Sequence, residues 1–124
     1  MTFGEFVSAK RLEKNMSVRA FADLIGISSS YLCEIEKGVR SAPRYEILLK
    51  FIEILSLDED ETYLLLDLAA SSKARQTVAQ DIVAYICNNN VVYQVLRTAV
   101  KNNVDMNKWE EMLKSVSMAE PQAE

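Results

Sequence analysis

Three consecutive serines, Ser28 to Ser30, and the nearby Glu34 carry side chains that can form hydrogen bonds with a polar partner. They belong to the segment GISSSYLCEIEKG of residues 26–38, in which the serines stand at a predicted helix start. A hydroxyl can donate or accept a hydrogen bond, so a serine can serve either a phosphate oxygen or a base edge. It can also cap the helix, and for Ser28 alone capping is the favoured interpretation.

These serines lie at the junction of two short predicted helices, residues 17–25 and 29–37, joined by a tight turn at residues 26–28. This spacing is that of a helix-turn-helix. If Leu32 and Ile35 pack inward, the step of about 100° per residue leaves the opposite side of the second helix exposed. The residues expected on that side are Ser29, Ser30, Cys33, Glu34 and Lys37.

The sequence pattern of the first part of the chain, residues 1–70, predicts five helices. The first begins with a capping box of Thr2 and Glu5, and the second is expected to turn Phe21, Leu24 and Ile25 inward. A fourth helix follows the polar link of residues 39–43. Four consecutive acids, Asp58 to Glu61, are expected on the first turn of the fifth helix, because the helix dipole favours negative charge there. We prefer this interpretation to a metal site.

The second part of the chain predicts three more helical stretches, at residues 78–87, 91–100 and 108–116. Asparagines at 88–90 and at 102–103 are expected to break them. Their apolar side chains recur at the spacing of a helix face, which suits either an intramolecular core or a dimer partner. These side chains include Ile82, Ile86, Leu96, Val100, Trp109, Met112, Leu113 and Val116.

The expected organisation is all-α: a five-helix head of residues 1–70, a linker of residues 71–77, a helical C-terminal oligomerisation region of residues 78–118 and a disordered tail of residues 119–124. The chain has 124 residues with only three glycines and two prolines, which is consistent with helices throughout.

Charge is distributed unevenly between the two parts. The formal net charge of the chain is -4, which at face value argues against a nucleic-acid partner. Residues 1–57, however, carry eight Lys/Arg against seven Asp/Glu, and residues 58–124 carry six against eleven. A local basic face on the first part therefore remains compatible with the composition.

Composition also argues against several classes of protein. No apolar run is long enough for a membrane span and no signal peptide is recognisable, so a cytoplasmic protein is expected. Cys33 and Cys87 lie far apart, and the sequence contains no histidine, so we expect free thiols and no metal or cofactor. Without a glycine-rich phosphate loop or a nucleophile-base pair, an enzyme is not expected.

Three segments resemble the Cro/phage-repressor (XRE) helix-turn-helix family: FGEFVSAKRLEK at 3–14, SVRAFADLIGISSSYLCEIEKG at 17–38 and PRYEILLKF at 43–51. Helix lengths, turn, glycines and apolar positions agree together over about residues 3–70. The segment DIVAYI at 81–86 and the helices that end in WEEMLK at 109–114 look like the C-terminal region of short regulators of this family carried by phages and integrative elements.

The resemblance implies roles for individual residues. It implies an internal ion pair between Arg11 and Glu36 in preference to a DNA contact of Arg11. For Glu34 two interpretations stay open, a base reader that accepts from a cytosine amino group and a residue aimed at solvent. Base reading is assigned to Ser29, Ser30 and Glu34, and contacts with the DNA backbone to Ser17, Arg19, Tyr31, Lys37, Arg40, Ser41 and Arg44.

Two departures from the family pattern weaken the expected grip on phosphate. Val18 stands where the family often carries a glutamine, and Val39 and Ala42 stand in a link that is often more basic and richer in proline. Cys33 would lie beside DNA, yet no cationic cluster is next to it in the sequence to activate the thiol, so a packing role is favoured over redox sensing.

The implied function is a sequence-specific DNA-binding transcriptional regulator, a repressor that acts as a homodimer on a two-fold operator in double-stranded DNA. The alternative is a protein-interaction module, an antitoxin or anti-repressor-like adaptor, whose acidic C-terminal half binds a protein partner.

Overall fold

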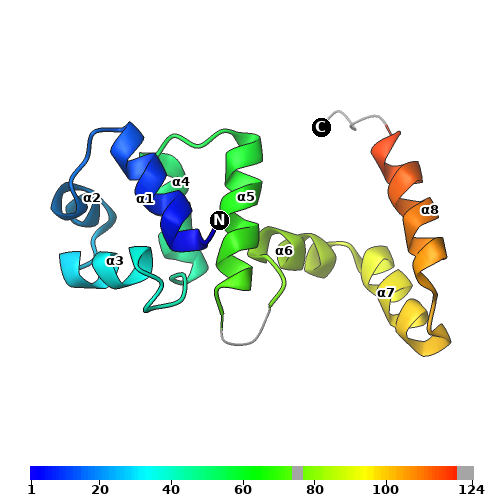
Figure 1. The fold of residues 1–124 in the computed structure, drawn as a ribbon. Helices are drawn as coiled ribbons and strands as arrows, with labels where there is room; N and C mark the ends of the chain where they lie inside the picture. The colour runs from blue at the N-terminus through cyan, green and yellow to red at the C-terminus, as the bar shows by residue number, and fades with distance from the viewer. Residues whose placement is uncertain (74–76, 120–124) are drawn as a thin grey trace. The chain divides into compact units, whose positions relative to one another are not determined.

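The computed structural model describes residues 1–73 and 77–119 (Figure 1). These residues form α-helices and no strand, so the prediction of an all-α fold is confirmed. The chain divides into two compact units, Met1–Ala84 and Tyr85–Glu124, which we call the first and the second unit. The helices are α1 (Phe3–Glu13), α2 (Val18–Ile25), α3 (Ser29–Glu36), α4 (Tyr45–Ile54), α5 (Glu59–Ser71), α6 (Gln80–Asn88), α7 (Asn90–Asn102) and α8 (Met106–Ser117).

Local capping explains where the helices of the first unit begin. The capping box of Thr2 and Glu5 at α1 is confirmed, with both hydrogen bonds formed. The hydroxyl of Ser17 caps α2, and that of Ser28 caps α3 by accepting from the backbone N–H of Tyr31 at 3.1 Å. The acids at residues 58–61 lie at the start of α5, as predicted, and Asp58 and Glu61 form a second capping box there.

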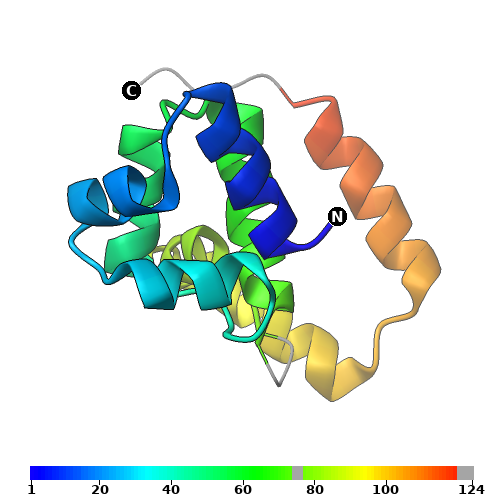
Figure 2. The ribbon, with the colours of Figure 1, turned by 60° about the vertical axis from the view of Figure 1, so that its left-hand side comes forward.

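The core of the first unit forms where α1 to α5 meet. Phe51 of α4 lies at its centre, with its ring 5.3 Å from that of Phe21 and 6.2 Å from that of Phe3. Figures 1 and 2 both show α3 running across α1 near one end of that helix. Gly4 makes this crossing possible, because a Cβ there would lie 2.4 Å from the backbone oxygen of Glu36.

One detail of the predicted packing was wrong, the inward position of Leu24. Leu24 is 62% exposed, and Ala22 is buried in its place beside Phe21 and Ile25. On a helix of 3.6 residues per turn, these three buried residues centre the inward face so that Leu24 lies about 100° away from it. Leu49 of α4 is also exposed.

Several predicted boundaries also differ from the structure. Asn88 and Asn90 are helical, so asparagine 89 alone separates α6 from α7. The last helix begins at Met106, because the side chain of Asp105 accepts from the backbone N–H of Lys108 at 3.1 Å. Of the predicted linker, Ser71 belongs to α5, and residues 74–76 lie outside the described part, as do residues 120–124 of the predicted tail.

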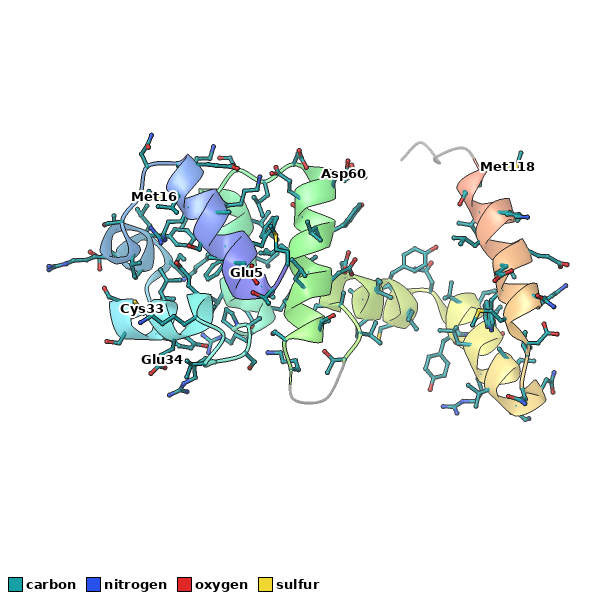
Figure 3. The ribbon with its side chains drawn as sticks, in the orientation of Figure 1. Glu5, Met16, Cys33, Glu34, Asp60 and Met118 are labelled. Atoms are coloured by element: carbon teal, nitrogen blue, oxygen red, sulfur yellow. The ribbon has the colours of Figure 1, made fainter. Side chains whose placement is uncertain are left out.

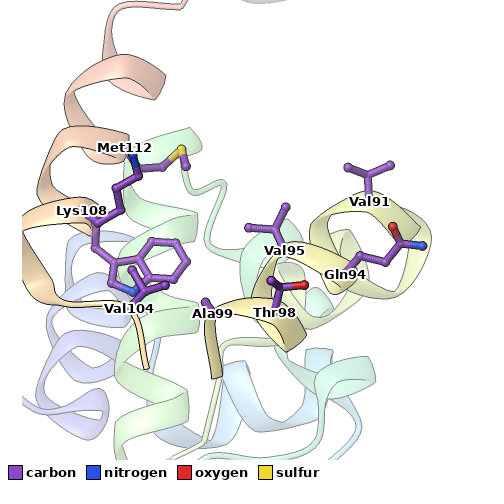
Figure 4. A pocket seen from close by; sticks show the side chains of 9 residues that line it. Val91, Gln94, Val95, Thr98, Ala99, Val104, Lys108 and Met112 are labelled. Carbon is purple, nitrogen blue, oxygen red and sulfur yellow. The ribbon is translucent and has the colours of Figure 1, made fainter. Parts of the chain in front are cut away.

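The second unit has helices but no buried residue among those described, residues 85–119. Its helices α7 and α8 border a groove of about 390 Å³, and Figure 4 shows side chains of both helices around this space. The groove is mainly apolar, and its apolar lining consists of Val91, Val95, Ala99, Val104, Trp109 and Met112. No helix among the described residues of the chain is long and apolar enough to cross a membrane.

Candidate nucleic-acid interface

Helix α3 presents a polar N-terminal turn on the surface of the first unit. Of the residues expected on the exposed side, Ser30 and Lys37 are exposed, whereas Ser29, Cys33 and Glu34 are half-buried. Leu32 and Ile35 are buried as predicted. The hydroxyl of Ser28 is used in capping. Of the three serines, Ser30 therefore offers the most accessible hydroxyl.

Glu34 is engaged by Arg40, a partner that the sequence did not indicate. The Nε of Arg40 donates to a carboxylate oxygen of Glu34 at 2.9 Å, and the backbone N–H groups of Val39 and Arg40 both donate to the Glu34 carbonyl. Both side chains keep substantial exposure, and with Ser28, Ser30 and Tyr31 they line a shallow open hollow. Figure 3 labels Glu34 and Cys33 on α3. The base-reading candidate Glu34 and the phosphate candidate Arg40 thus neutralise each other in the unbound protein.

The remaining backbone-contact candidates are distributed over α2, the end of α3 and the loop after it. All except Tyr31 are exposed, namely Ser17, Arg19, Lys37, Arg40, Ser41 and Arg44. Tyr31 is half-buried and packs against the core cluster, as does Val18. The Nε of Arg44 lies 3.6 Å from a carboxylate oxygen of Glu46 in an exposed ion pair. Four of these candidates are cations, of which Arg40 and Arg44 are paired with Glu34 and Glu46.

A buried ion pair fixes α3 to α1. The Nε and one terminal nitrogen of Arg11 each donate to a carboxylate oxygen of Glu36 at 2.9 Å, and the other terminal nitrogen donates to the carbonyl of Met16 at 2.8 Å. The two paired side chains are only 10% and 9% exposed. Hydrogen bonding to Glu36 raises the pKa of Arg11, so the guanidinium stays charged. Arg11 is therefore occupied inside the first unit.

The loop that follows α3 is anchored by residues that we had assigned to a linker. The hydroxyl of Ser72 accepts from the backbone N–H of Ala42 at 2.8 Å, and the ammonium of Lys73 donates to the Ala42 carbonyl at 2.6 Å. These contacts join positions thirty residues apart, so no periodicity in the sequence could have revealed them. Cys33 is half-buried and Cys87 exposed, and both are free thiols as predicted.

Comparison with known proteins identifies the arrangement of α2 and α3. Residues 7–61 match the family HTH_3, Helix-turn-helix. Among solved structures, a chain of a SinR protein/SinI protein complex is similar over 94% of this chain and 95% of its own length, with 21% identity and a TM-score of 0.48. A likeness of that extent establishes neither activity nor partners. No curated protein matches the chain. Residues 7–61 are thus similar to the helix-turn-helix family, and α2 and α3 are the two short helices of that arrangement.

Proposed function

We propose that the chain is a sequence-specific repressor of transcription that binds a two-fold DNA operator as a homodimer. The observation that carries this proposal is the exposed turn at the start of α3, with cationic side chains at the other end of the same helix and in the loop beyond it. A recognition helix enters the major groove with its first residues toward the base edges. Cations that flank it can neutralise phosphates on either side.

In this proposal, Ser29, Ser30 and Glu34 read bases. The small side chains of the serines allow the backbone of α3 to approach the groove, and Ser30 is the most exposed of the three. To accept from a cytosine amino group, the Glu34 carboxylate must either break its ion pair with Arg40 or bind the base and Arg40 together. The freed guanidinium of Arg40 is then available for a phosphate.

Base reading is tested first by the substitution Ser30→Ala. We expect a loss of about 1–3 kcal/mol in binding to the natural operator, concentrated at one base-pair position, if the serine makes a well-formed contact. Footprinting at the promoter of the protein's own gene supplies the operator, and a full set of single base-pair variants measures the preference. Ser71→Ala, an exposed serine of α5, is the matched control. The assignment is wrong if substitution of each of the three base-reading residues leaves every affinity unchanged.

Phosphate binding is tested by Arg40→Gln. One fewer counterion is released, so binding to all sequences should weaken alike and the salt slope should fall by about one unit. Because the substitution also frees the carboxylate of Glu34, the double variant Glu34→Gln/Arg40→Gln removes that added repulsion. A loss limited to one operator sequence with an unchanged slope would instead make Arg40 a base-reading residue.

For the homodimer, we propose that residues 78–118 supply the contact between two copies. The apolar groove between α7 and α8 supports this, since pairing two such faces removes apolar area from water. A two-fold pair can present two recognition helices about 34 Å apart, as successive major grooves require. Removing these helices should weaken operator binding. The truncation should follow Asn88, because an earlier end would remove Ser72, Lys73 and the buried Ala79 from the first unit.

The apolar groove supports the second candidate function equally well. In that case the chain is a protein-interaction module, and a different protein binds α7 and α8 in place of a second copy. The acidity that first suggested this function lies elsewhere: six of the eleven acids of residues 58–124 precede residue 85. Residues 85–124 carry four Lys/Arg against five Asp/Glu, so this region is nearly neutral. A purified chain that stays monomeric at the concentrations at which it binds DNA would favour this candidate over the homodimer.

A further inference from the structure

The loop between α3 and α4, residues 37–44, carries Arg40 and Arg44 among the cations proposed to bind phosphate. It also carries Ser41, and all three side chains are exposed. Between them the backbone turns inward at Ala42, which is only 3% exposed. The position of the loop therefore depends on how the Ala42 peptide groups are held.

Both peptide groups of Ala42 are bound by the two residues that directly follow α5, Ser72 and Lys73. The backbone N–H donates to the hydroxyl of Ser72 at 2.8 Å, and the carbonyl accepts from the ammonium of Lys73 at 2.6 Å. The Ser72 hydroxyl in turn donates to the carbonyl of Ala69 at 2.7 Å. This second bond uses the hydroxyl proton and leaves its lone pairs to accept from Ala42.

Burial makes these two bonds necessary for the loop. A buried backbone N–H or C=O without a partner is unfavourable, and the next residue, Pro43, has no N–H to offer. The other end of the loop is fixed to α3, where the Glu34 carbonyl accepts from the N–H groups of Val39 and Arg40. The segment with the proposed phosphate contacts is thus held at both ends.

We propose that Ser72 and Lys73 are positioning residues for DNA binding, which hold the Ala42 peptide so that Arg40 and Arg44 can reach phosphates, and do not contact DNA themselves. This inference rests on the proposed function. A loop released from Ala42 would have to be ordered again on DNA, and its cations would neutralise phosphate less effectively.

The test uses a substitution that changes no charge. In the full chain, Ser72→Ala removes the acceptor for the Ala42 N–H, and Ser71→Ala is the matched control, since the Ser71 hydroxyl donates to the carbonyl of Asp67 within its own helix. Affinity for the footprinted operator is titrated over a series of salt concentrations, at a temperature where melting curves show every variant folded. We expect Ser72→Ala to weaken binding about tenfold and to lower the salt slope by roughly one to two units.

A fall in salt slope without loss of charge is the decisive result, because a general loss of stability would not change the number of counterions released from DNA by folded protein. Ser72→Thr keeps the hydroxyl and should restore the slope. Equal slopes and affinities for Ser72→Ala and Ser71→Ala, with an unaltered chain that binds the operator, would overturn the inference. An unaltered chain that does not bind DNA would instead overturn the proposed function.

The role of Lys73 needs a separate experiment, because a lysine could also bind a DNA phosphate directly. Lys73→Met is therefore combined with Ser72→Ala. If both residues act through Ala42, the double variant should bind with nearly the slope of Ser72→Ala alone. A further fall of about one unit would show that Lys73 itself neutralises a phosphate, and would overturn its assignment as a positioning residue.

Discussion

The two units of this chain use similar helices in different ways. In Met1–Ala84, helices α1 to α5 turn their apolar faces toward one another and bury a core around Phe21 and Phe51. In the second unit, α7 and α8 are as long as α1 and α5, yet no described residue of that unit is buried. Helical spacing and caps thus fix where the helices lie in both units, whereas a core requires enough neighbouring helices to cover it.

The strongest way to break the first unit alone is to remove a partner from its buried ion pair. Glu36→Ala leaves the guanidinium of Arg11 without its carboxylate, and we expect the free energy of unfolding to fall by about 3–5 kcal/mol. Denaturant titration followed by circular dichroism measures this loss. Glu53→Ala, at an exposed position of α4, is the control. A loss no larger than that of the control would mean that water screens the pair.

A substitution in the groove of the second unit should change the self-association of the chain and leave its free energy of unfolding unchanged. Met112→Gln places an amide in the apolar groove, and we expect self-association to weaken about ten- to a hundredfold, or about 1.4–2.8 kcal/mol. Sedimentation at several protein concentrations measures the constant. Met106→Gln alters a methionine of the same helix that does not line the groove. Equal effects of the two substitutions would place the contact between copies elsewhere.

The smallest expected effect concerns the link between α1 and α5. The hydrogen bond from Lys10 lowers the pKa of Glu61 from its ordinary value of 4.5, and the same bond raises the pKa of Lys10. The stability that Glu61 adds is therefore present above pH 4.5 and is lost as the pH falls through its lowered pKa. It is also lost at the alkaline end, as the pH rises through the raised pKa of Lys10.

Glu61→Gln isolates this link, because glutamine can still complete the capping box with Asp58. The variant should be less stable than the unaltered chain at neutral pH, and the two stabilities should converge in acid. Unfolding curves at a series of pH values check this, and added salt should reduce the difference. A difference that stays constant down to strongly acidic pH would contradict the assignment to the ion pair.

Sequence reasoning succeeded where a feature depends on near neighbours. The caps by Thr2 and Ser28 each involve residues three positions apart, so they could be read directly. The inward positions of Leu32 and Ile35 followed from helical spacing in the same way. Base reading by the α3 residues came from family resemblance and stays a prediction.

Sequence reasoning failed where segments that are far apart in the sequence meet in the fold. The Ala42 peptide and its partners Ser72 and Lys73 are brought together only by the packing of α5 against the loop, so the sequence suggested a mere linker there. The exposure of Leu24 depends on which residues of α2 other helices cover, and hydrophobicity alone could not indicate this. The pairing of Glu34 with Arg40 depends on the left-handed turn at Gly38 and on the fold of the loop after it.

The groove of the second unit also determines what the intrinsic fluorescence of the protein can report. Trp109, which lines that groove, is the only tryptophan of the chain. Its emission is sensitive to the polarity around the indole, so a partner that covers the groove should shift the emission to shorter wavelength. The core around Phe51 contains no tryptophan and contributes nothing to that signal. Tryptophan emission and far-ultraviolet circular dichroism therefore distinguish association of the second unit from unfolding of the first within a single unlabelled sample.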